Sequence, residues 1–147
     1  MNFKDFIRKG LVRRASRDKN IEKSLYKNTI SDLIYLNKIK IDEFSSRKIL
    51  TNYYDCLRTI LEVLASIEGF KIYQHEAFVF YLKEKKEGII SLKFDRFRKI
   101  RNAVNYYGKD VSVEETKEYI LEIKKIINYL IDKYLSEFSW NKELLIS

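Results

Sequence analysis

The 147-residue chain contains no proline and only four glycines. Proline breaks helices because its ring removes a backbone donor and clashes with the preceding turn, so a chain without it can form long, uninterrupted helices. Apolar residues make up 46% of the sequence and aromatic residues 14%, which is enough to build a core and too much for a disordered chain. The sequence therefore predicts a single all-α domain over residues 1–147, made of helices joined by short turns.

Apolar residues recur at steps of three and four, the spacing of one buried helix face. The predicted helices cover about residues 18–40, 45–69, 76–86, 91–107 and 113–138. The second has the most regular apolar face and is expected to be central, with the buried residues Ile49, Tyr53, Cys56, Leu57, Ile60, Leu61 and Leu64. The segment 70–75 is β-branched and aromatic but too short and isolated for a sheet, so a turn is expected there.

The first long helix is expected to begin at Asp18 or Asn20, because either side chain can accept a hydrogen bond from the free amides of the first turn. Its apolar positions predict a core face formed by Ile21, Leu25, Leu33, Leu36 and Ile39. At the other end of the chain, residues 139–147 are expected to fray.

Positive charge is concentrated at the N-terminal end. The chain has a net charge of +8, and residues 1–23 hold eight basic and three acidic residues, a net charge of +5. Within this stretch, residues 1–17 form a basic amphipathic segment whose apolar positions fit one face of a short helix. Such a segment can lie on nucleic acid or on an anionic membrane, or dock on its own bundle; docking is the favoured prediction.

Several kinds of site are not expected. The single cysteine, Cys56, excludes an internal disulfide, and its place on an apolar helix face predicts burial. One histidine and one cysteine are too few for a common zinc framework, and the four separated glycines form no phosphate-binding loop, so neither a metal nor a cofactor is expected. No apolar run reaches the length of a membrane span and no signal peptide is evident, so we expect a cytoplasmic protein without a membrane partner.

The stretch from Phe94 to Gly108 combines an apolar stripe with helix-ending signals. Its stripe consists of Phe94, Phe97, Ile100, Val104 and Tyr107, spaced to share one buried face. Gly108 follows where a left-handed closing residue is expected, and Ser112 to Glu115 has the spacing of a capping box that starts the next helix. The stretch is thus predicted to be the end of a helix.

Four polar side chains flank this stripe: Arg98, Arg101, Asn102 and Asn105. Because residues three and four apart are neighbours on a helix, two guanidinium groups and two amides can meet around one anionic group. The spacing also fits a solvated or ion-paired helix edge. The two asparagines favour a site, because asparagine is a mediocre helix former and its amides need specific partners. These four residues are our predicted phosphate-binding set.

The chain resembles the HEPN families of small helical-bundle proteins from bacteria and archaea over about residues 20–134. The resemblance lies in three blocks that occur in order: Tyr53 to Leu57 running on to Gly69, Gln74 to Phe78, and Arg98 to Asn102 followed by Asn105 to Gly108.

This resemblance implies an up-and-down bundle of four to five helices, and commonly a homodimer in which the Arg-Asn helices face each other. Many HEPN proteins are metal-independent ribonucleases or toxins paired with a small nucleotidyltransferase antitoxin, whereas others are non-catalytic binding modules. In catalytic members a histidine follows the motif arginine after four to six intervening residues. Here the corresponding positions after Arg101 hold Tyr106, Tyr107 and Gly108, so the histidine that moves the proton is missing.

The expected function is therefore a HEPN-like, non-catalytic binding module that holds RNA or a nucleotide, or docks a nucleotidyltransferase antitoxin partner. One alternative is a metal-independent ribonuclease in which Tyr106 or His75 replaces the missing histidine; its candidate catalytic residues are Arg101, Tyr106 and His75. Another alternative is a helical dimerisation scaffold. His75 lies at a predicted helix start, where a capping or bridging role is favoured over catalysis.

Overall fold

The computed structural model describes residues 1–138, so the tail expected to fray lies outside the described residues. The elements of this part are, in order, α1 (Phe3–Arg8), β1 (Val12–Arg14), α2 (Lys19–Lys38), α3 (Ser46–Ile67), β2 (Phe70–Ile72), α4 (His75–Glu84), α5 (Gly88–Tyr107) and α6 (Val113–Tyr134). The chain is mostly helical, which confirms the predicted class. Within the described range, no helix has both the length and the apolarity needed to cross a bilayer.

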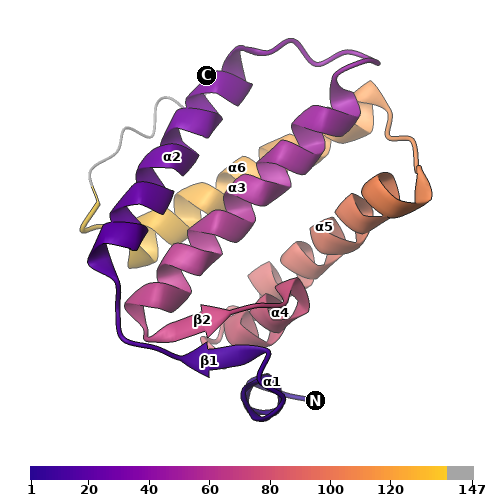
Figure 1. Cartoon of the computed structure of the whole chain (residues 1–147). Helices are drawn as coiled ribbons and strands as arrows, with labels where there is room; N and C mark the ends of the chain where they lie inside the picture. The colour runs from indigo at the N-terminus through magenta and orange to yellow at the C-terminus, as the bar shows by residue number, and fades with distance from the viewer. Residues whose placement is uncertain (139–147) are drawn as a thin grey trace.

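Helix α3 lies at the centre of the bundle. It packs against α2, α5, α6 and β2, and Figure 1 shows it between α2 and α5 with α6 behind. All seven of its predicted core residues are buried, none more than 5% exposed, including Cys56. Burial also raises the pKa of the Cys56 thiol to about 12, which keeps the thiol protonated and unreactive. The prediction of a central helix is confirmed.

Helix α2 begins as predicted, and its core face differs from the prediction at Ile21. The Asp18 side chain accepts a hydrogen bond from the Ile21 amide at 3.0 Å, so Asp18 is the N-cap. Ile21 itself is 53% exposed, and the prediction that it lies in the core is wrong. Glu22 is buried instead, because its carboxylate accepts hydrogen bonds from Arg17 at 2.9 Å and Ser66 at 2.8 Å. The rest of the predicted face is confirmed, because Leu33 and Leu36 are buried and Leu25 and Ile39 pack against the core.

The turn expected at residues 70–75 is also wrong, because β2 forms a two-stranded antiparallel sheet with β1. Val12 pairs with Ile72 and Arg14 with Phe70. The partner strand comes from the N-terminal segment, and no local pattern around residue 70 reveals a pairing so distant in the sequence. This small sheet joins the N-terminal segment to the end of α3 (Figure 1).

The N-terminal segment docks on the bundle, as the favoured prediction held. Phe3 and Phe6 of α1 are buried; the Phe6 ring lies 5.1 Å from that of Phe80, and the Phe3 ring 5.2 Å from that of Phe70. Arg13 and Arg14 of β1 stay exposed. The segment is therefore part of the fold, and its basic side chains remain on the surface.

Helix α5 begins earlier than predicted and ends where predicted. The break before it falls at Lys86, which has a positive φ of 63°, and Gly88 is the first helical residue. At the other end Gly108 adopts the expected left-handed conformation with φ 66°. Tyr107 is 85% exposed, so its predicted burial is wrong; the residues from Asn105 to Gly108, after the buried Val104, are all exposed.

Helix α6 follows with the Ser112 hydroxyl accepting a hydrogen bond from the Glu115 amide at 3.0 Å, as the capping pattern predicts. It ends at Tyr134, four residues before the predicted end at residue 138. Its Ile120, Ile123 and Ile127 pack into the core beside α3.

Docking of the N-terminal segment is tested by Phe6→Ala. Removal of the buried ring should lower the free energy of unfolding by about 3 kcal/mol, because a cavity is left against Phe80. Urea unfolding followed by circular dichroism measures the change. Lys4→Ala, at an exposed position of the same helix, is the control and should change stability by less than about 0.5 kcal/mol. Equal stability of Phe6→Ala and wild type would mean that the segment is not docked.

Candidate functional site

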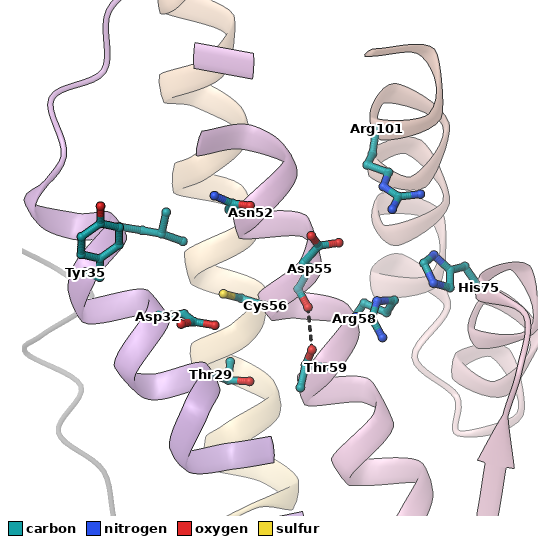
Figure 2. A pocket seen from close by; sticks show the side chains of 11 residues that line it. Thr29, Asp32, Tyr35, Asn52, Asp55, Cys56, Arg58, Thr59, His75 and Arg101 are labelled. Atoms are coloured by element: carbon teal, nitrogen blue, oxygen red, sulfur yellow. Dashed lines mark hydrogen bonds between the residues drawn. The ribbon is translucent and has the colours of Figure 1, made fainter. Parts of the chain in front are cut away.

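A cleft of about 590 Å³ runs across the outward face of α3. Its floor is formed by Asn52, Asp55 and Thr59, which lie three and four residues apart on α3. Figure 2 shows α2 at one side of this floor, and α5 with the first turn of α4 at the other. The cleft volume falls within the range of small-molecule sites, about 300–1,000 Å³.

His75, the first residue of α4, lines one side of this cleft. Its Nδ1 lies 3.1 Å from the hydroxyl oxygen of Tyr54, with which it shares a hydrogen bond. Tyr54 is buried and its ring stacks on Phe94 at 5.5 Å, so the partner of His75 is held rigidly. His75 therefore has a fixed orientation beside the cleft.

Loss of hydration and, to a smaller extent, the positive charges of Arg58, Arg101 and Arg98 together lower the pKa of His75 to about 4. The imidazole is thus neutral at pH 7, in part because three cations lie near it. Burial raises the pKa of the Tyr54 hydroxyl, which keeps that group protonated as well. The surroundings of His75 are therefore suited to an anion and unsuited to a further positive charge.

The three guanidinium groups differ in their partners. Arg58 pairs with Glu62, and Arg98 pairs with Asp95 at 2.7 Å. Arg101 has no carboxylate partner among residues 1–138: its Nε is buried without a hydrogen bond, and a terminal nitrogen has only a 3.4 Å contact with the Asn102 side chain.

An unpaired buried donor on a cation is costly in free energy, so the absence of a partner needs an explanation. The guanidinium of Arg101 lies 5.7 Å from the ring centre of Tyr54 and 6.0 Å from that of Tyr106, and these contacts help to hold it in place. They do not supply an acceptor for Nε. An anionic ligand in the cleft would supply one.

The structure brings some of the predicted site residues together and separates others. Arg101 and His75 line the cleft, Asn102 contacts Arg101, and Arg98 stands near enough to act on His75. Tyr106 lies beside Arg101 but is 69% exposed. Asn105 is exposed and lines a separate hollow with Arg47 and Lys48.

Sequence reasoning missed most of the cleft, including Arg58, Asp55 and Asn52 of α3 and Asp32 and Tyr35 of α2. The α3 members belong to the polar face of that helix, opposite the apolar face that the sequence predicts. The polar spacing of Asn52, Asp55 and Thr59 was a usable signal, since it marks the solvent side of the central helix. Burial raises the pKa of the Asp55 carboxyl, while Arg58 and Arg101 act in the opposite direction to a smaller extent.

Within the described part of the chain, no group of three or more His, Cys, Asp or Glu side chains is arranged to hold a metal ion. Comparison with protein-family models, curated proteins and solved structures gives no match to this chain. The likeness to HEPN proteins therefore stays a prediction, and the functional inference depends on the chemistry of the cleft.

The environment of His75 is tested directly by titration, because it is the single histidine of the chain. In NMR spectra its ring protons should titrate with a pKa of about 4, well below the ordinary 6.5. Arg101→Gln should raise this pKa, whereas Arg96→Gln, at an exposed residue of the same helix paired with Glu122, should not. A wild-type pKa near 6.5 would contradict the burial and charge described for the cleft.

The lowered pKa of His75 also predicts how the stability of the fold depends on pH. As the pH falls below 6.5, the unfolded chain binds a proton at His75 before the folded chain does, so stability should decrease between about pH 6.5 and 4. In His75→Gln this contribution is absent, and the loss of stability over that interval should be smaller. An unchanged pH dependence in the variant would contradict the lowered pKa.

Proposed function

We propose that this protein is a HEPN-like binding module that holds a phosphate group, of RNA or of a nucleotide, in the cleft beside Arg101. One observation carries the proposal: the buried Nε of Arg101 lacks a partner in the described residues, although Arg101 stands within a group of three arginines. A bound anion would satisfy this donor and offset the local positive charge.

Phosphate suits the cleft better than other common anions. A guanidinium group presents several N–H donors in a plane, and phosphate offers oxygens in the matching geometry. Arg101 would make the closest contact, with Arg58 and Arg98 adding charge from positions already fixed by Glu62 and Asp95. The neutral imidazole of His75 adds one further polar group to the cleft.

The homodimer and the nucleotidyltransferase partner implied by the resemblance remain proposals. Tyr106 and Tyr107 support a contact between chains at the end of α5, because both are large aromatic side chains and are 69% and 85% exposed. An isologous dimer across this end would bring two clefts near one another.

Phosphate binding is tested with a short, labelled single-stranded RNA in a fluorescence anisotropy titration. Affinity should fall steeply as salt rises, because binding releases counterions from the RNA. Arg101→Ala should weaken binding by about ten- to a hundredfold, the value of a hydrogen bond to a charged group. Arg96→Ala removes the same charge from the exposed side of α5 and should have a much smaller effect. Equal losses in the two variants, or no binding at all, would contradict a site at Arg101.

A metal-independent ribonuclease is the second candidate function, and the position of His75 favours it. His75 and Arg101 come from different helices yet line the same cleft, so a base and a phosphate-binding cation are available without a motif histidine on α5. In such a reaction the ribose 2′-hydroxyl attacks the adjacent phosphate while a base accepts its proton. With a pKa of about 4, however, His75 is a weak base at neutral pH, and binding without cleavage is better supported.

Cleavage is tested by incubating labelled RNA with the purified protein in EDTA at neutral pH. We expect the RNA to remain intact at protein concentrations that saturate binding, because losing an effective general base typically costs about a hundred- to ten-thousandfold in rate. Accumulation of 2′,3′-cyclic phosphate ends that disappears in His75→Ala, but persists in Tyr106→Phe, would make the protein an enzyme with His75 as its base. Loss in Tyr106→Phe alone would assign that role to Tyr106.

A further inference from the structure

The part of the cleft away from His75 contains a carboxylate without a partner. Asp55 is half-buried in the floor, and its side chain makes no hydrogen bond or ion pair with any residue in the described range 1–138. Arg58 and Arg101 act on its charge, yet Arg58 pairs with Glu62 and Arg101 with no carboxylate in that range. One cleft therefore contains both arginines that can bind an anion and a carboxylate that can accept hydrogen bonds from a ligand.

These groups are arranged in order along the cleft. Figure 2 shows the side chains of His75, Arg58 and Arg101 at one side of α3, Asn52 and Asp55 on it, and Asp32 and Tyr35 on α2 at the far side. Tyr35 is 66% exposed, so its ring is open to a ligand. A ligand that fills the cleft thus meets cations first, then the Asp55 carboxylate and an amide, and finally a second carboxylate, Asp32, and an aromatic ring.

This order restricts the ligand. A purely anionic molecule would be repelled by Asp55, so a ligand that extends along the cleft needs an anionic end and a hydrogen-bond-donating part. A nucleotide has both, and the four bases differ in the donors that they offer. Guanine presents an imino and an amino N–H side by side, which match the two oxygens of one carboxylate. Uracil presents one N–H between two carbonyl oxygens, which a carboxylate repels.

We propose that the cleft selects a guanine nucleotide, free or within single-stranded RNA, with its phosphate at Arg101 and its base at Asp55. This proposal rests on the proposed phosphate site and adds base recognition to it. The Asn52 amide is placed to donate to the guanine carbonyl oxygen, and the open Tyr35 ring to stack on the base. The cleft volume of about 590 Å³ accommodates a ligand of nucleotide size.

The experiment compares guanosine, adenosine, cytidine and uridine monophosphates, together with inorganic phosphate, as competitors of a bound labelled RNA. Wild type should bind the guanine nucleotide about five- to a hundredfold more tightly than the uridine nucleotide, the discrimination of one good bidentate contact. Asp55→Asn should remove this preference without weakening the binding of inorganic phosphate, because the carboxylate that it removes repels an anion. Glu118→Gln, at an exposed carboxylate of α6 outside the cleft, should behave as wild type.

Two further measurements define the ligand. Tyr35→Leu should weaken nucleotide binding and not phosphate binding, and the exposed position makes loss of the fold an inadequate explanation. Oligouridine and the same RNA with one central guanine distinguish the two sources of the base. If the RNA with a central guanine binds more tightly than both oligouridine and the free guanine nucleotide, the site is assigned to RNA. If the free nucleotide binds more tightly than that RNA, the site is assigned to the nucleotide. Either result supports the proposal.

Equal affinity for guanine and uridine ligands, or a guanine preference that survives Asp55→Asn, overturns base recognition and leaves the phosphate site standing. Failure of every competitor, inorganic phosphate included, together with an Arg101→Ala variant that binds RNA as wild type does, overturns the proposed function itself. The two failures are therefore distinguishable.

Discussion

The burial of one face of α3 determines where every group of the candidate site can lie. Ile49, Leu57 and Leu64 turn inward against the surrounding helices, and this packing sets the rotation of the helix about its own axis. The opposite stripe, with Asn52, Asp55 and Thr59, must then form the outer surface. Because α2 and α5 flank α3 (Figure 1), that stripe becomes the floor of the cleft. Core packing and site geometry are thus two results of the same apolar pattern.

The electrostatics of the cleft follow from the unequal pairing of its charges. Two of the three arginines near His75 have carboxylate partners, whereas Arg101 has none in the described chain. The protein holds His75 neutral through burial and through these positive charges, so the site gathers donors and cations without adding a further cation at neutral pH. This is a state that an anion stabilises. In our proposal, Asp55 limits the anion to one end of the cleft and leaves the other end to a hydrogen-bond donor.

The sequence predicts those parts of the fold that depend on local pattern. The core face of α3, the Asp18 and Ser112 N-caps and the left-handed Gly108 follow from spacing and residue type, and all occur. Local pattern failed where a distant partner decided the outcome. The β1–β2 pair joins the segment before α2 to the segment after α3. The burial of Glu22 depends on its hydrogen bonds with Arg17 and Ser66.

The same distinction applies to the site. Arg101 was identifiable from its helix and its asparagine neighbours, because that pattern is local. Its association with Arg58 and His75 arises only when α3, α4 and α5 pack together.

The most direct test of the account uses His75, the single histidine, as a probe of ligand binding by NMR. Saturation with inorganic phosphate or short RNA should raise the pKa of His75 from about 4 by about 1–3 units, since a bound anion offsets the nearby guanidinium charges. A pKa that stays unchanged at saturation would contradict phosphate binding beside Arg101.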